Sequence, residues 1–145
     1  MNTDQDAPPG GGLHTGGCLC GAVRYRVSGP LAPIQFCHCS QCRKAQGGAF
    51  AANIPVAEAA LEIDDPEGRL TSFESSPGKV RVFCGACGSP IFSKTTAKPG
   101  VRRLRAGSLD APVRTGPGFH IFADSRADWW PILDALPRYS ERAPD

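Results

Sequence analysis

Seven cysteines, gathered into three short clusters, are the feature of this 145-residue chain that most constrains its fold. The clusters read Cys18-Leu19-Cys20, Cys37-His38-Cys39-Ser40-Gln41-Cys42 and Cys84-Gly85-Ala86-Cys87. Thiolates at such spacings are typical zinc ligands, and four of them close one tetrahedral shell while three leave a coordination position open. An odd number of cysteines also leaves one over in any full set of disulfides, so metal binding is favoured over a disulfide or redox role.

The first and third clusters each contain two cysteines followed directly by a glycine, Gly21 in the first and Gly88 in the third. A glycine at that position permits the turn that points backbone N–H groups at the sulfurs. Two such pairs supply four thiolates, which is the donor set of a structural zinc. The sequence therefore predicts one structural zinc that contributes much of the folding free energy. Its predicted ligands are Cys18, Cys20, Cys84 and Cys87.

The middle cluster contributes three thiolates, and no further cysteine is left to complete its shell. We therefore predict that Cys37, Cys39 and Cys42 bind a second zinc, for two per chain, with one position open to water or to a soft ligand such as a substrate thiol. A thiol held there would lose its proton and become a nucleophile. The alternatives are a second structural zinc completed by His38 or another side chain, and an iron or iron–sulfur occupant.

Short alternating segments separated by turn-forming residues predict an all-β fold. The chain contains 17 glycines and 14 prolines, which favour turns over long helices. Residues 40–46 have a helix-tolerant composition, so one or two short helical turns are expected there. We expect a disordered tail over residues 1–15, one zinc-binding domain over 16–140 and a short tail over 141–145. Strands are expected over 22–27, 34–36, 50–54, 70–73, 79–83, 91–93, 101–106 and 119–122.

The net charge and the hydropathy pattern restrict the partners and the cellular compartment that we expect. The formal net charge is +2 and no long apolar run is present, so we expect neither a nucleic-acid partner nor a membrane partner. Residues 1–17 show no basic segment followed by an apolar run, so we expect no signal peptide and take the cytoplasm as the compartment. Cysteines stay reduced there, which agrees with a role as metal ligands. The sequence leaves the oligomeric state open.

The residues around the cysteines form three longer motifs, Gly17–Tyr25, Phe36–Ala45 and Phe83–Pro90. At these motifs the chain resembles the glutathione-dependent formaldehyde-activating enzyme family, which includes the centromere protein V branch. The resemblance implies a β-tent fold, built from small antiparallel sheets around a structural zinc. It assigns the first and third cysteine pairs to that zinc, and the three cysteines of the middle cluster to a second, reactive zinc.

The resemblance also implies an activity. The reaction named for the family joins formaldehyde to glutathione to give S-hydroxymethylglutathione, and it is classed with the carbon–sulfur lyases. We therefore expect a zinc-dependent enzyme that acts on a small-molecule thiol such as glutathione and on its aldehyde adduct. Glutathione carries two carboxylates, so a binder needs cations near the open zinc, and Arg43 and Lys44 are nearest in sequence. The alternative is a non-catalytic zinc module that binds a protein or buffers formaldehyde adducts.

Overall fold

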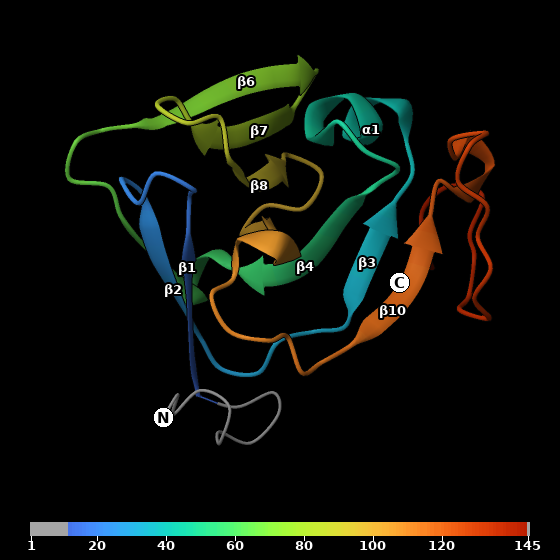
Figure 1. Ribbon diagram of the computed structural model, residues 1–145, viewed down its shortest axis with the longest axis horizontal. Helices are drawn as coiled ribbons and strands as arrows, with labels where there is room; N and C mark the ends of the chain where they lie inside the picture. Colours follow the sequence, from blue (N-terminus) through green and yellow to red (C-terminus); the bar gives the residue numbers. More distant parts are fainter. Residues whose placement is uncertain (1–11, 145) are drawn as a thin grey trace.

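The computed structural model describes residues 12–144, which form two β-sheets and one α-helix (Figure 1). The small sheet has the strand order β1-β2-β5, and the large sheet has the order β10-β3-β4-β9-β8-β7-β6. The all-β class predicted from the sequence is confirmed. The strands are β1 (Leu13–Gly17), β2 (Arg24–Ser28), β3 (Ile34–Cys37), β4 (Ala51–Ala57), β5 (Leu61–Asp64), β6 (Leu70–Ser76), β7 (Lys79–Cys84), β8 (Pro90–Thr95), β9 (Val101–Arg105) and β10 (Pro117–Ile121).

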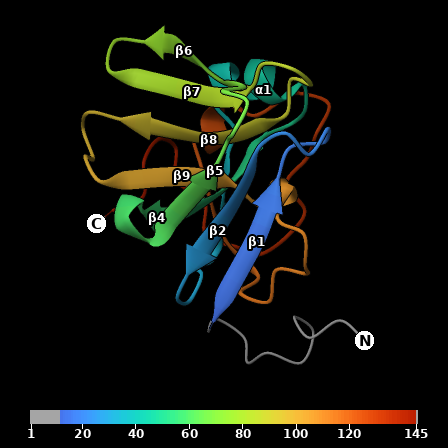
Figure 2. The ribbon, with the colours of Figure 1, turned by 90° about the vertical axis from the view of Figure 1, so that its left-hand side faces the viewer.

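The large sheet is antiparallel except at one edge, where β10 pairs with β3 in parallel. Figure 2 shows β6, β7, β8 and β9 following one another across this sheet, with the small sheet facing the viewer. The parallel pairing aligns Cys37 at the end of β3 with Ile121 at the end of β10. Parallel strands need a long connection. Segments far apart in the sequence therefore meet beside the middle cysteine cluster.

The main core lies between the sheets and follows from the two-residue period of the strands. In β2, Tyr25 and Val27 are buried while Arg24 and Arg26 are exposed. In β9, Leu104 is fully buried against the same apolar cluster. Successive side chains of a strand point to opposite faces, so each strand offers one face to the core. A fully buried aliphatic side chain stabilises the fold by roughly 1.5–3 kcal/mol.

Helix α1 (Ser40–Gln46) covers the residues for which the sequence predicted helical turns. It begins after Cys39, whose Sγ accepts a hydrogen bond from the backbone N–H of Cys42 at 3.3 Å. It ends at Gly47, which adopts the left-handed conformation typical of a helix C-terminus. Three 3₁₀ turns, η2 (Glu58–Ala60), η3 (Ala106–Ser108) and η4 (Ala123–Ser125), complete the described elements. Across residues 12–144, no helix combines the length and the apolar character that crossing a membrane requires.

Strand β1 includes part of the stretch that the sequence analysis placed in the N-terminal tail. Leu13, His14 and Thr15 pair with β2, and the His14 ring Nε2 lies 3.1 Å from the carbonyl oxygen of Gly29. The ordered domain therefore begins at least three residues before the expected boundary at residue 16. The rest of the expected tail, residues 1–11, lies outside the described residues, as does Asp145 at the other end.

Candidate functional site

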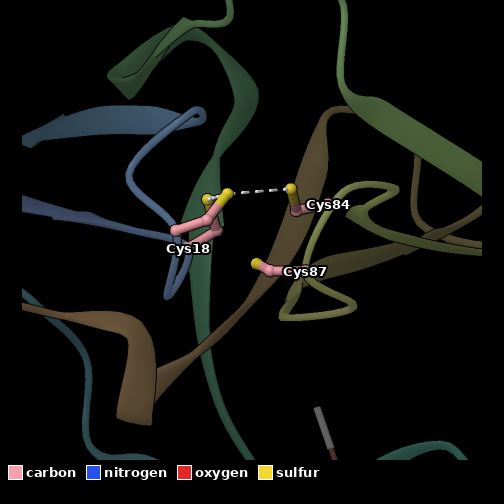
Figure 3. Close-up of side chains that lie close together, drawn as sticks. Cys18, Cys84 and Cys87 are labelled. Atoms are coloured by element: carbon pink, nitrogen blue, oxygen red, sulfur yellow. Dashed lines mark hydrogen bonds between the residues drawn. The ribbon is translucent and has the colours of Figure 1, made fainter.

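The first and third cysteine clusters of the sequence meet in space and form one group of four cysteines, called the first cluster from here on. This group connects the loop after β1 to the turn between β7 and β8. Cys18 and Cys20 follow β1. Cys84 ends β7, and Cys87 precedes β8. The four sulfurs all lie within 4.8 Å of one another. Figure 3 shows side chains from the two loops converging on one point, which ties the small sheet to the large one.

Both loops of this cluster use a glycine in the left-handed region to turn back toward the sulfurs. Gly21 has φ of 83° and Gly88 has φ of 81°, a conformation that costs other residues steric strain. The backbone N–H of Gly88 donates to the carbonyl oxygen of Cys84 at 2.7 Å. The backbone N–H of Val23 donates to Cys18 Sγ at 3.3 Å. The turn that the sequence predicted at these glycines is therefore present.

The sulfur spacing of the first cluster fits a tetrahedral zinc. With Zn–S bonds of about 2.3 Å, neighbouring sulfurs of a tetrahedron lie roughly 3.8 Å apart. The Sγ atoms of Cys18 and Cys20 are 3.6 Å apart, and those of Cys20 and Cys84 are 3.8 Å apart. The four thiols are therefore placed to hold one metal ion with little rearrangement. A site able to hold a metal here is confirmed, and zinc as its occupant stays a prediction.

The middle cluster of the sequence, called the second cluster from here on, is formed by the end of β3 and the first turn of α1. Cys37 is the last residue of β3, Cys39 precedes α1, and Cys42 lies within the helix. The three sulfurs lie within 4.8 Å of one another, and the Sγ atoms of Cys37 and Cys42 are 3.3 Å apart. A second apolar cluster that includes Ala51 and Ile121 surrounds them. A three-sulfur donor set is thus held by packing around it.

No other metal-binding side chain joins these three sulfurs within residues 12–144. His38, the fourth ligand considered above, is fully buried, and its Nε2 lies 2.8 Å from Nδ1 of His120. His120 Nε2 in turn lies 3.0 Å from a carboxylate oxygen of Asp134. Nδ1 of His38 is buried without a hydrogen-bond partner. The His38 ring is therefore engaged in a histidine–histidine–aspartate chain rather than in the sulfur cluster.

Negative charge in the second cluster collects on Cys42. Hydrogen bonds from Cys37 and then from Cys39, together with the guanidinium of Arg81, lower the pKa of Cys42 to about 2. The same sulfur contacts raise the pKa of Cys37. The two terminal nitrogens of Arg81 lie 3.8 and 3.7 Å from Cys42 Sγ. A thiolate beside a fixed guanidinium is prepared for metal binding without an external base.

Arg81 belongs to a polar row that crosses the large sheet on the side of the second cluster. In the strand register, Arg81 of β7 lies opposite Ser93 of β8, and Ser93 lies opposite Arg103 of β9. Residues directly opposite one another in paired strands point to the same face. Lys79, two residues before Arg81, shares this face. Val80 and Val82, which alternate with Lys79 and Arg81 along β7, pack against the main core instead.

This face lines a cavity of about 700 Å³ whose wall also contains all three cysteines of the second cluster. We call it the basic cavity, because its described lining contains five cationic residues and no aspartate or glutamate. The cationic residues are Lys79, Arg81, Lys98, Arg103 and Arg142. Sequence reasoning did not assign these residues to the site. One sequence pattern could have indicated them. Lys79 and Arg81 are two residues apart on one strand, and Arg103 and Arg105 are two residues apart on another, so each pair places two cations on one face of its strand.

Arg43 and Lys44, the substrate-binding residues expected from sequence proximity, both lie on α1. Neither is among the residues that line the basic cavity. The Nε atom of Arg43 is buried without a hydrogen-bond partner, and Lys44 is exposed. On a helix this short, the residues that follow Cys42 point away from it within one turn. Their role in binding a substrate stays a prediction.

Fold and site together define a small β-sheet protein with a closed four-sulfur centre and an open three-sulfur centre at a cavity. The family model described as glutathione-dependent formaldehyde-activating enzyme matches residues 13–125, and the chain belongs to this family. The matched range contains all seven cysteines. Membership inferred from the motifs is therefore confirmed.

Two individual proteins resemble this chain, one in sequence and one in fold. A curated protein of Halomonas elongata, named "Putative glutathione-dependent formaldehyde-activating enzyme", is 32% identical over 126 residues, covering 81% of this chain and 79% of that protein. A crystal structure of a Rhodobacter sphaeroides protein has a TM-score of 0.58 and 23% identity, covering 68% of this chain and 89% of that one. The second likeness shows that the fold occurs in another protein.

Proposed function

We propose that the chain is a cytoplasmic, two-zinc enzyme that joins a thiol such as glutathione to formaldehyde, or splits the adduct in reverse. The single observation that carries this proposal is the three-cysteine cluster, which lacks a fourth protein ligand among the described residues and lies in the wall of the basic cavity. The family description and the name of the Halomonas relative agree with glutathione-dependent formaldehyde activation.

The residues of the second cluster fit the metal that this chemistry needs. Zinc held by Cys37, Cys39 and Cys42 would supply a Lewis acid that keeps an incoming thiol in its thiolate form at neutral pH. Arg81 contacts Cys42 Sγ and stabilises the negative charge of the sulfur cluster. Lys79 and Arg103 place further positive charge in the same cavity, where a carboxylate of the substrate would bind.

The proposed reaction conserves atoms and electrons without an oxidant. The thiol gives up its proton, and its sulfur lone pair forms a new bond to the aldehyde carbon. The π electrons of the carbonyl move to oxygen, which takes up one proton, so thiol and formaldehyde become a hydroxymethyl thioether. The reverse reaction breaks the same carbon–sulfur bond, which makes the enzyme a carbon–sulfur lyase in that direction. The cavity residues act by binding and orienting the thiol beside the aldehyde.

The two cysteine clusters allow a matched experiment. Wild-type protein should contain about two zinc ions per chain, as predicted from its two donor sets. Cys39→Ser should keep one zinc and a folded circular dichroism spectrum, and it should lose both glutathione binding and the acceleration of formaldehyde–glutathione exchange seen by NMR. Cys84→Ser should lose the fold, since structural zinc sites contribute about 10–16 kcal/mol in small peptides.

The same pair of variants can overturn the proposal. If Cys39→Ser unfolds as Cys84→Ser does, the second site is structural and the non-catalytic module is the better description. If Cys39→Ser folds and still binds glutathione with unchanged affinity, the thiol binds elsewhere. Either result removes the second cluster as the reactive centre.

A further inference from the structure

The segment that follows η4 returns to β10 and runs alongside it (Figure 1). We call residues 137–144 the strap. The backbone N–H of His120 donates to the carbonyl oxygen of Pro137 at 2.9 Å, and that of Tyr139 donates to the carbonyl oxygen of His120 at 3.0 Å. The rings of Tyr139 and Phe119 pack edge to face, with their centroids 5.7 Å apart. The strap is therefore fixed to the strand that pairs with β3.

The backbone at the end of β10 holds the strap further along. Among residues 12–144, Phe122 is the one residue other than glycine with a positive φ, at 52°. A left-handed backbone strains such a residue, and strain of this kind is often found at functional sites. The N–H groups of Phe122 and Ala123 donate to the carbonyl oxygens of Glu141 and Tyr139, at 2.8 and 3.0 Å. The strap is therefore anchored as far as Glu141.

The residues after this last anchor reach the site of the proposed chemistry. Arg142, Ala143 and Pro144 line the basic cavity. Ala143 also packs against the apolar cluster that contains Cys37 and Cys42. This wall of the cavity lies beyond residue 125, where the match to the family model ends. The strap therefore gives the cavity a cationic side chain close to the three-sulfur centre.

The arginines of the cavity differ in what surrounds them. Arg81 contacts the sulfur of Cys42. Burial lowers the pKa of Arg103, the sulfurs of Cys37 and Cys42 oppose this shift, and the guanidinium of Arg142 adds to it. Arg142 is exposed, and it forms no ion pair with a carboxylate of residues 12–144. Arg103 and Arg142 are thus two guanidiniums that act on each other within one cavity.

Two guanidiniums that share a space are suited to an anion between them, since each can donate paired N–H groups to a carboxylate. We propose that Arg142 is a substrate-binding residue, which together with Arg103 holds a carboxylate of the thiol whose sulfur reaches the second cluster. The inference rests on the proposed function and adds a residue to its binding site. Glutathione fits this arrangement because it carries carboxylates and a thiol on one molecule. The cavity volume of about 700 Å³ lies in the range of small-molecule sites.

Isothermal titration calorimetry of the zinc-loaded protein tests this contact. Arg142→Met should bind glutathione about fivefold more weakly at low ionic strength, near the upper end for an exposed ion pair. Its melting temperature should not change, because the exposed side chain forms no ion pair within residues 12–144. Arg142→Lys keeps the charge without the paired N–H groups, so its affinity should be intermediate. Arg26→Met removes an arginine that pairs with Glu62 outside the cavity, and it should bind as the wild type does.

Glutathione dimethyl ester separates a carboxylate contact from other effects of the substitution. The ester keeps the thiol and the ammonium group and lacks both negative charges. Arg142→Met should therefore not weaken the binding of the ester. For glutathione, the difference between the variant and the wild type should shrink as salt is added, because salt screens an exposed ion pair. An equal loss of affinity for glutathione and the ester, or no loss for either, would overturn the inference.

S-methylglutathione separates the inference from the proposed function. It keeps both carboxylates and blocks the thiol, so it should bind the wild-type protein at least tenfold more weakly than glutathione if the sulfur engages the second cluster. Equal binding of the two, or no binding of glutathione at all, would refute the proposed function and the inference with it. If glutathione binds through its sulfur and Arg142→Met binds it as tightly as the wild type does, only the assignment of Arg142 is wrong.

Discussion

Gly16→Ala is expected to destabilise the fold strongly, because strand β1 packs directly on a buried tyrosine. A Cβ at Gly16 would lie 2.3 Å from the hydroxyl oxygen of Tyr25 and 2.5 Å from the carbonyl oxygen of Ser108. Real Cβ atoms do not approach other atoms so closely, and one of the two neighbours is backbone. Tyr25 is 1% exposed, so its ring has no open space into which it can move.

The size of the loss in stability follows from the groups that the new Cβ forces to move. Overpacking a rigid site costs about 1–3 kcal/mol. Moving the Tyr25 ring also breaks its 2.6 Å hydrogen bond to the Ser108 hydroxyl, which adds about 1 kcal/mol. The lower entropy of alanine in the unfolded chain returns about 0.4–1 kcal/mol. We therefore expect the free energy of unfolding to fall by about 2–3 kcal/mol.

Urea denaturation at a fixed free zinc concentration measures this change. Gly48→Ala is the matched control, because its added Cβ would meet no heavy atom within 4 Å and its φ is not in the left-handed region. The control should be neutral or slightly stabilising, by up to about 1 kcal/mol. A loss below about 1 kcal/mol for Gly16→Ala would show that β1 does not pack on Tyr25 as described.

Two further predictions concern pH and metal. Burial raises the pKa of the Tyr25 hydroxyl to about 12, so the unfolded chain releases this proton at a lower pH than the folded chain does. The free energy of unfolding of the wild-type protein should therefore fall between about pH 10 and pH 12. The fall should be roughly 2 kcal/mol larger than that of Tyr25→Phe, which lacks the hydroxyl. Urea titrations at pH 8 and pH 11 check this, and parallel curves for the two proteins would contradict it. A mild chelator should remove one zinc first with the circular dichroism spectrum unchanged, because three thiolates hold an ion less firmly than four. Unfolding that coincides with the first zinc released would contradict this order.

The cysteine clusters could be predicted from the sequence because their information is local. The spacing of the pairs Cys18/Cys20 and Cys84/Cys87 is enough to predict a metal site, and the glycine that follows each pair predicts the turn. The helix at residues 40–46 is similarly local, since its start at a cysteine cap and its end at a glycine lie within a few residues. Tetrahedral coordination then requires the two pairs to meet, whatever path the chain takes between them.

The basic cavity could not be predicted in this way because it depends on strand pairing. Lys79 and Arg81 lie on β7 and Arg103 on β9, and they share a face only because β8 pairs with both strands in a particular register. A shift of one residue would turn these side chains to the other face. Strand β1 was missed for a related reason. Its glycines carry no apolar pattern, and its place is set by Tyr25 on the partner strand.

The two faces of the large sheet carry different kinds of side chain, apolar on the face toward the core and cationic on the face toward the basic cavity. Val82 and Leu104 point into the core shared with the small sheet, whereas Arg81 and Arg103 point into the cavity. The four-sulfur centre joins the small sheet to the large one. In the proposed function its metal would stabilise the fold, while the three-sulfur centre would keep one coordination position for a ligand. Substitutions on the cavity face can therefore change the charge of the cavity while the core packing is kept. Under the proposed function, the cationic side chains of this face would contact the charged groups of the substrate, and the cysteines would hold the metal.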